Sequence, residues 1–140
     1  MTANPKIGYS LSSEEHGGKD LVRFGAVSDH FHPWNGIQGN SPFVWNVLGG
    51  LAAAAPDARL GTGVTCPTIR IHPAVIAQAV ATTAEMAGSF FFGIGTGENL
   101  NEHILGDQWP PIDQRLDMLE EAMDLMRKLW SGEEITHRGT

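Results

Sequence analysis

An acid, two imidazoles and an indole lie close together at residues 28–34, directly after the short apolar run 24–27. A run of that length and polarity is typical of a buried strand. Imidazole titrates near neutral pH and a neighbouring carboxylate can fix its tautomer, so Asp29 followed by His30 is suited to proton transfer. Because chemistry in parallel α/β proteins collects at the carboxyl ends of strands, we interpret this segment as a candidate site. A capped turn with a solvent-facing histidine is the alternative.

The pair His30 and His32 also has the H-x-H spacing that binds metal in some barrel hydrolases. A metal would need further ligands, and His72, His103 and Glu102 lie on other expected loops. No Asp or Lys completes a recognisable set. The sequence therefore predicts no metal site, and a metal-dependent barrel hydrolase that uses His30 and His32 stays an alternative function.

A second candidate segment, 93–98, reads Gly-Ile-Gly-Thr-Gly-Glu and invites comparison with the dinucleotide fingerprint G-x-G-x-x-G. The comparison fails, because Gly97 comes one position early, Glu98 occupies the place of the third glycine, and 99–103 does not begin an apolar helix. A carboxylate at that place would also repel a pyrophosphate. Backbone amides with a hydroxyl, an amide and one carboxylate suit a neutral, hydrogen-bonding ring system better. A tight glycine turn without a ligand is the alternative.

Strands and helices alternate along the rest of the chain. The expected strands are 6–12, 24–27, 59–65 and 89–95, and the expected helices are 42–55, 73–86 and 113–130. This alternation is typical of a parallel sheet with right-handed crossovers. The segment 13–23 leaves almost no room for a helix, so we expect a shortened first crossover. Ser41 is expected to cap the first helix.

The last helix shows the clearest apolar stripe. We expect this stripe to pack in the core, and it consists of Leu116, Leu119, Met123, Met126 and Trp130. Core packing is the preferred interpretation of such a stripe over a cofactor site. Gly132 is expected to end the helix.

Composition bounds the function. The chain has 140 residues, of which 41% are hydrophobic and 18% charged, as in a single globular domain with its own core. A net charge of −7 argues against nucleic acid as a partner, and no apolar run is long enough to span a membrane. The one cysteine, Cys66, fits a reducing compartment, so a cytoplasmic location is expected, and it is interpreted as a packing residue rather than a nucleophile.

Four ordered segments together resemble the luciferase-like flavin and deazaflavin oxidoreductases, namely 28–34, 61–68, 72–78 and 95–102. Within that family the chain is most similar to the branch of coenzyme F420-dependent glucose-6-phosphate dehydrogenase and its relatives. The resemblance implies an α/β fold, the N-terminal half of a TIM (β/α) barrel with about four strands. It also implies that coenzyme F420, or FMN as the alternative, lies across the strand ends.

The same resemblance assigns roles to individual residues. It implies that His30 is the catalytic acid or base and that Glu98 is a second catalytic candidate for proton transfer. Trp34 would line the substrate side. The implied cofactor-binding residues are Asp29, Gly63, Val64, Cys66, Thr96, Gly97 and Asn101. Gly63 and Val64 would be joined by a non-proline cis peptide bond beneath the ring.

The expected function is that of an F420-dependent oxidoreductase, which transfers a hydride between an alcohol- or sugar-type small-molecule substrate and the deazaflavin. The alternatives are an FMN-dependent luciferase-like monooxygenase, the metal-dependent hydrolase, and an inactive half-barrel fragment. A homodimer is expected. By resemblance the enzymatic activity belongs to a full-length parent.

The chain departs from the family in two places. The first crossover is about a dozen residues short, and residues 1–140 are expected to form one partial barrel domain that is truncated at the C-terminus, which leaves no basis for sugar-phosphate specificity. Four strands cannot close a barrel that needs eight. We therefore expect this chain alone to be a dimer, an aggregate or a loosely packed state without catalytic activity, in which Phe90 to Phe92 face water.

Overall fold

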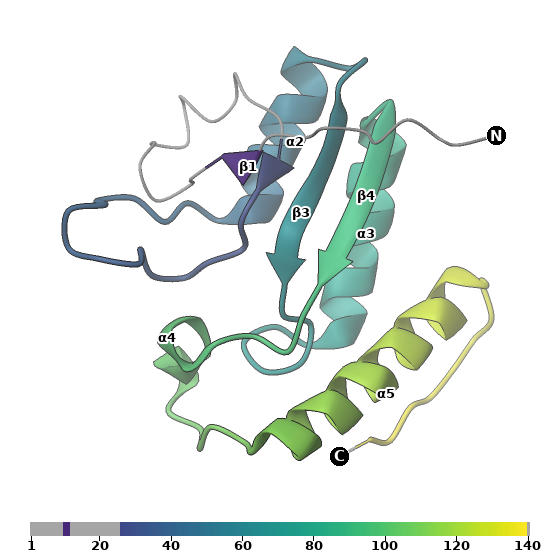
Figure 1. Ribbon diagram of the computed structural model, residues 1–140. Coiled ribbons are helices and arrows are strands. Elements are labelled where there is room, and N and C mark those ends of the chain that lie inside the picture. The colour runs from purple at the N-terminus through teal and green to yellow at the C-terminus, as the bar shows by residue number, and fades with distance from the viewer. Residues whose placement is uncertain (1–9, 12–25, 140) are drawn as a thin grey trace, which may run out of the picture.

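The computed structural model describes residues 10–11 and 26–139. Its elements, in chain order, are β1 (Ser10–Leu11), β2 (Ala26–Val27), α2 (Val44–Ala54), β3 (Arg59–Thr65), α3 (Pro73–Met86), β4 (Ser89–Ile94), α4 (Asn99–Glu102), the 3₁₀ helix η1 (His103–Leu105) and α5 (Ile112–Trp130) (Figure 1). Most of the expected first strand and the whole of the expected short crossover at 13–23 lie outside the described residues.

In the described part of the chain, four strands form one parallel sheet in the order β1-β2-β3-β4. The α/β class and the expected strand count are thereby confirmed. Because every pairing is parallel, all carboxyl ends lie at one edge of the sheet, where the arrows of β3 and β4 point (Figure 1). The β3–β4 pairing runs in register from Arg59 opposite Ser89 to Thr62 opposite Phe92, and shifts before Thr65.

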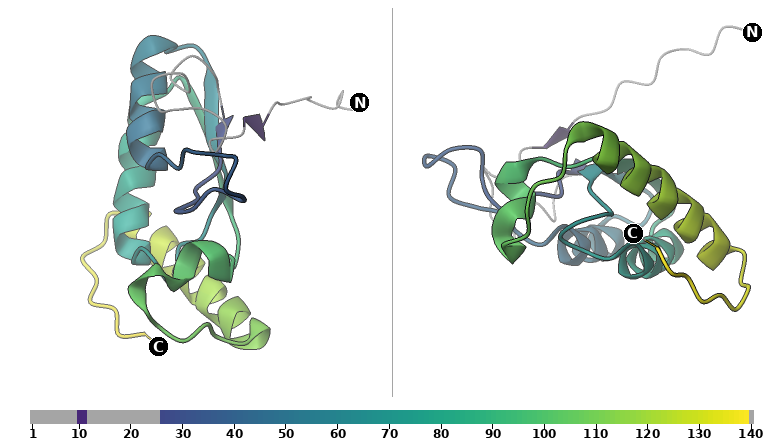
Figure 2. Two further views of the ribbon diagram at one scale, coloured as in Figure 1. Left: turned by 90° about the vertical axis from the view of Figure 1, so that its left-hand side faces the viewer. Right: turned by 90° about the horizontal axis from the view of Figure 1, so that it is seen from below.

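Helices α2 and α3 cover one face of this sheet. The left view of Figure 2 shows both on the same side of the strands. Two apolar clusters form the core. One joins the sheet to α2 and consists of Val27, Val44, Val47, Leu48, Leu51, Ala52 and Leu60, and the other joins α3 to α5 and consists of Ile76, Ala77, Val80 and Met126. Trp45 and Phe90 pack against both clusters. Fully burying one valine, leucine, isoleucine or methionine side chain of these clusters stabilises the fold by roughly 1.5–3 kcal/mol.

The expected helix caps are only partly present. Ser41 does not cap α2, because the residue before the helix is Phe43, without a side-chain cap, and the Ser41 hydroxyl donates to the backbone oxygen of His30 at 2.7 Å. The prediction for Ser41 was therefore wrong, since a contact with a distant loop replaces the local one. At α3 it is His72 that caps the helix, with Nδ1 accepting from the N–H of Ala74 at 3.1 Å.

Helix α5 packs on α3 with a narrower face than its apolar stripe predicts. Its buried residues are Ala122, Leu125 and Met126. Leu116 and Trp130 are 51% and 45% exposed, so the prediction that both lie in the core was wrong. The stripe identifies an amphipathic helix, but only the part of it that faces a neighbouring element becomes buried. Trp130 still docks by its edge, because Nε1 donates to the backbone oxygen of Ala77 at 3.0 Å.

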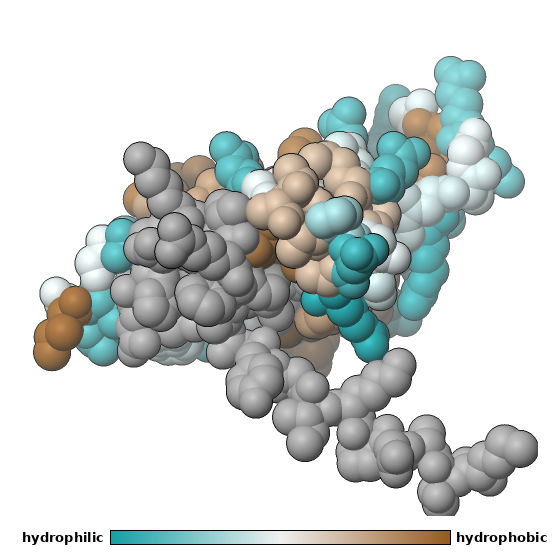
Figure 3. Space-filling model, turned by 90° about the horizontal axis from the view of Figure 1, so that it is seen from above, coloured by the Kyte–Doolittle hydropathy of each residue, from teal (hydrophilic) through white to brown (hydrophobic). Residues whose placement is uncertain are grey.

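The other face of the sheet carries exposed apolar side chains. Phe90 and Phe92 point into the helix layer, whereas Phe91 between them is 37% exposed. The expectation that 90–92 faces water therefore holds for the middle residue only, as alternation along a strand dictates. Seen from the end at which β3 and β4 begin, apolar atoms reach the surface among hydrophilic ones (Figure 3). Among the described helices, none is both long and apolar enough to cross a membrane.

Candidate functional site

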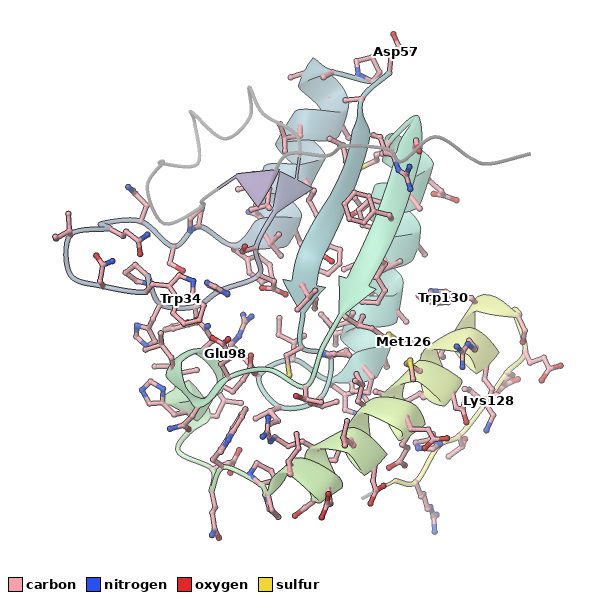
Figure 4. The ribbon with its side chains drawn as sticks, viewed as in Figure 1. Trp34, Asp57, Glu98, Met126, Lys128 and Trp130 are labelled. Atoms are coloured by element: carbon pink, nitrogen blue, oxygen red, sulfur yellow. The ribbon has the colours of Figure 1, made fainter. Side chains whose placement is uncertain are left out.

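A pocket of about 180 Å³ opens at the carboxyl edge of the sheet. It is lined by Asp29, His30, Val64, Cys66, Gly95, Thr96, Gly97, Glu98, Asn101 and Glu102. Val64 comes from the end of β3, and the other residues come from the segments that follow β2, β3 and β4. Trp34 and Glu98 lie at this end of the sheet and Asp57 at the opposite end (Figure 4). The structure thus brings together eight of the ten predicted site residues, while Gly63 and Trp34 adjoin the pocket without lining it.

Asn101 anchors the loop that follows β2. Its side-chain Oδ1 accepts hydrogen bonds from the backbone N–H groups of Phe31 and His32, at 2.9 and 3.0 Å. The residue is buried and belongs to α4, a single helical turn inside the segment that was predicted to be a loop. That prediction was wrong because this turn is polar, and its stability comes from such contacts rather than from an apolar face. Asn101 therefore lines the pocket and also holds the loop after β2 in place.

A buried ion pair joins the three loops, and its cation was not predicted. Arg70 Nη2 donates to Asp29 Oδ1 at 2.8 Å, and the backbone N–H of Arg70 donates to Glu102 Oε2 at 2.9 Å. The guanidinium Nε also lies 3.8 Å from Glu102 Oε1. The side chain of Arg70 is 8% exposed and those of both acids are 1% exposed. A single arginine in a loop gives no sequence signal, since its partners are far away along the chain.

The ionised carboxylate of Glu102 is unfavourable in this cluster because it is buried and lies near a second acid. Burial raises the pKa of its carboxyl above the ordinary value of 4.5, and Asp29 raises it further, while the N–H and the charge of Arg70 lower it. One cation thus serves two buried acids, and desolvation dominates at Glu102. Glu102, which the sequence offered as a candidate metal ligand, is instead paired with Arg70.

Asp29, which lines the pocket, has one carboxylate oxygen without a partner in the described part of the chain. Its Oδ1 is occupied by Arg70, whereas Oδ2 is buried and has no hydrogen-bond partner among the described residues. A buried carboxylate oxygen without a partner is costly, so this atom calls for a donor from a bound molecule. An N–H of a heterocyclic ring fits that requirement, and a phosphate does not. The residues present therefore fit the ring of a deazaflavin or flavin.

His30 lines the pocket, and Trp34 lies against His30 beside it. Their rings meet edge to face, with centroids 5.2 Å apart and planes at 77°. The backbone of His30 is fixed by the Ser41 hydroxyl. Trp34 is exposed, and Glu98 is exposed at the rim. An imidazole held in this way can exchange a proton with a molecule in the pocket.

The floor of the pocket is formed by the irregular end of β3. The peptide bond between Gly63 and Val64 is cis, which confirms the expectation. This bond falls within the shift of the β3–β4 register, and the Val64 side chain is 49% exposed. An apolar surface is thus presented where a flat ring could lie.

The far wall of the pocket is a tight turn at Gly97. Arg115 and Trp109, which the sequence did not single out, lie beside this turn. Gly97 has φ +75°, and a Cβ there would lie 2.7 Å from Cys66 Sγ. Arg115 of α5 donates from Nη1 to Thr96 Oγ1 at 3.2 Å, and its guanidinium stacks 4.5 Å from the Trp109 ring centroid. The Cys66 thiol is buried and burial raises its pKa, as befits a packing residue.

The histidines that could bind a metal have other contacts. His32 stacks on His103 with ring centroids 5.3 Å apart, and His72 caps α3. Within the described residues, no three His, Cys, Asp or Glu side chains are grouped so that they could hold a metal ion.

Comparison with known proteins identifies the family. Residues 24–140 match the family model described as luciferase-like monooxygenase. The chain belongs to this family. It is 40% identical to the F420-dependent glucose-6-phosphate dehydrogenase of Microbacterium testaceum over all of its own length and 45% of that protein. The protein of the same name from Segniliparus rotundus is also 40% identical, over 97% of this chain and 41% of the relative.

Solved structures give the same picture. An F420-dependent secondary alcohol dehydrogenase, in complex with an F420-acetone adduct, superposes with a TM-score of 0.87 at 35% identity, over 96% of this chain and 44% of that one. The FMN-bound oxygenating constituent of a Pseudomonas putida diketocamphane monooxygenase superposes with a TM-score of 0.67 at 21% identity, over 87% of this chain and 34% of that one. This likeness shows the shared fold alone. The chain spans less than half the length of the relatives that it matches.

Proposed function

We propose that this chain carries the cofactor site of an F420-dependent oxidoreductase that transfers a hydride between an alcohol- or sugar-type substrate and the deazaflavin. We call the natural polypeptide that contains residues 1–140, at whatever length it is made, the parent chain. The observation that carries the proposal is the pocket lined by Asp29, whose Oδ2 accepts from no described residue, by the Val64 side chain and by the turn at Gly97. The names of the relatives, at 35–40% identity, support it.

The proposal includes the architecture of the parent chain. The four parallel strands would form the N-terminal half of an eight-stranded (β/α) barrel, and the remaining strands would come from outside residues 1–140. The exposed side chains of Val64 and Phe91 support this placement, because they lie on the sheet face that α2 and α3 leave open. The barrel would enclose that face.

Bound F420 would supply the hydride chemistry. Asp29 would accept a hydrogen bond from a ring N–H through Oδ2, and Val64 would pack beneath the ring. His30 would take the proton of the substrate hydroxyl during oxidation and return it during reduction, a contribution worth about 10²–10⁴ in rate. Glu98 at the rim is the second candidate for this proton, and Trp34 would bound the substrate beside His30.

Titration of the parent chain with F420, followed by fluorescence quenching, tests the proposal. We expect saturable binding that a chelator leaves unchanged, and weaker binding of FMN. Tighter binding of FMN would favour a luciferase-like monooxygenase instead. Binding or turnover that requires zinc and is abolished by the chelator would favour the hydrolase.

A further inference from the structure

The buried guanidinium of Arg70 pairs with two acids of the pocket, and the proposed function assigns it no task. Its side chain is almost fully buried, yet it does not line the pocket. It lies behind Asp29 and Glu102, at the point where the segments after β2, β3 and α4 meet. Such a group can act on a bound molecule only through its neighbours.

The two acids depend on Arg70 to different degrees. Glu102 accepts from the backbone N–H of Arg70, a contact that any residue at this position except proline would keep. Asp29 accepts from the guanidinium, through Nη2 to Oδ1 at 2.8 Å, and its backbone oxygen lies 3.4 Å from the same nitrogen. The Arg70 side chain therefore fixes both the carboxylate of Asp29 and the backbone that carries it.

We infer that Arg70 is a positioning residue for the cofactor site: by occupying Oδ1 of Asp29 it turns Oδ2 toward the pocket as an acceptor for a ring N–H of the cofactor. A carboxylate can accept at both oxygens, and the donor on one of them decides where the other points. The planar fork of arginine reaches side-chain and backbone oxygens at once, which the ammonium of lysine does in a different geometry. This inference rests on the proposed function, since it concerns how F420 is held.

A double-mutant cycle in the parent chain tests whether Arg70 acts through Asp29. F420 affinity is measured by fluorescence titration for the parent chain, Arg70→Met, Asp29→Asn and the double variant. Each single variant is expected to weaken binding about ten- to a hundredfold, the range for losing a hydrogen bond to a charged group. If Arg70 acts only by orienting Asp29, the double variant binds within about twofold of Asp29→Asn alone.

Further variants separate positioning from a general loss of structure. Arg70→Lys keeps the charge and is expected to restore part of the affinity lost in Arg70→Met. Arg70→Met leaves the buried carboxylates of Asp29 and Glu102 without their cation, and the double variant removes one of the two, so it should fold at least as well as Arg70→Met. If Arg70→Met does not fold, Arg70→Lys replaces it in the cycle. Arg127→Met is the matched control, because Arg127 is an exposed arginine of α5 that pairs with Asp124. The F420 affinity of this variant is expected to equal that of the parent chain.

The outcomes are distinguishable. If the parent chain binds F420 and the losses of the two single variants multiply in the double variant, Arg70 acts by another route and the inference is overturned while the proposed function stands. Unchanged affinity in a folded Arg70→Met would overturn it as well. If the unsubstituted parent chain does not bind F420, the proposed function fails and this inference fails with it.

Discussion

Gly97 lies so close to Cys66 that a Cβ at position 97 would come within 2.7 Å of Cys66 Sγ, from a backbone with φ +75°. Gly106 offers a natural comparison, because its φ is +82° but nothing lies within 4 Å of the place where its Cβ would be. The two glycines share the left-handed backbone and differ in the space around them.

We therefore predict that Gly97→Ala is more harmful than Gly106→Ala. The left-handed conformation alone costs a residue with a Cβ about 1–2 kcal/mol, which both variants pay. Gly97→Ala must in addition displace Cys66 or the turn, and so should also weaken F420 binding. Denaturant unfolding and fluorescence titration measure the two effects, and equal losses in both variants would show that Cys66 yields without cost.

His30→Ala in the parent chain should lower turnover about 10²- to 10⁴-fold, the usual contribution of a general acid or base. The affinity for F420 should stay nearly unchanged, because Asp29, Val64 and the turn at Gly97 make the proposed ring contacts. Steady-state kinetics and titration give the two values. His137→Ala is the control, since His137 pairs with Glu121 away from the pocket. If turnover survives in His30→Ala, Glu98 is the next residue to substitute.

Glu102→Gln should stabilise the protein at neutral pH. Burial raises the pKa of the Glu102 carboxyl above 4.5, so the folded chain binds this proton more tightly than the unfolded chain does. Stability is then lost as pH rises from about 4.5 through the raised folded pKa, and the glutamine removes that loss.

Thermal unfolding as a function of pH checks this prediction. The advantage of Glu102→Gln should be absent at low pH, grow across that window and level off above it. Glu120→Gln, an exposed position on α5, is the control and should change little. A Glu102→Gln protein that is less stable than the parent at neutral pH would mean that the charge pairing with Arg70 outweighs burial.

Residues 1–140 alone should form a dimer, an aggregate or a loosely packed state, and should lack turnover. The exposed apolar side chains of Val64 and Phe91 favour association, at about 25 cal/mol per Å² of apolar surface removed from water. Size-exclusion chromatography with near-UV circular dichroism decides the matter. A monodisperse monomer with a sharp, cooperative melt would contradict the prediction.

The sequence correctly predicted those helices and strands that are marked by a local pattern of apolar residues and breakers. The predicted strands at 59–65 and 89–95 and the predicted helix at 73–86 follow from apolar runs and from Pro73, and the structure has them at those residues or within one of them. The gathering of His30, Cys66 and Glu98 around one pocket followed from the rule that strand ends meet and from the family resemblance.

What could not be predicted depends on partners distant in sequence. Ser41 has the residue type of a helix cap, but its hydroxyl bonds to His30 eleven positions away. Arg70 gains its importance from acids on two other loops, and Leu116 is exposed because no described element covers that end of α5. In each case the residue type was compatible with several contacts, and the fold selected one.

The side-chain oxygen of Asn101 accepts from the backbone N–H groups of residues 31 and 32 in the loop after β2. These two bonds do not depend on which side chain stands at position 31, whereas the His32 ring has a contact of its own with His103. Phe31 is half-exposed next to His30, so a different residue at position 31 would change the surface there and leave the anchor of the loop intact. The sequence beside the pocket can thus vary without a change in the backbone bonds that hold this loop.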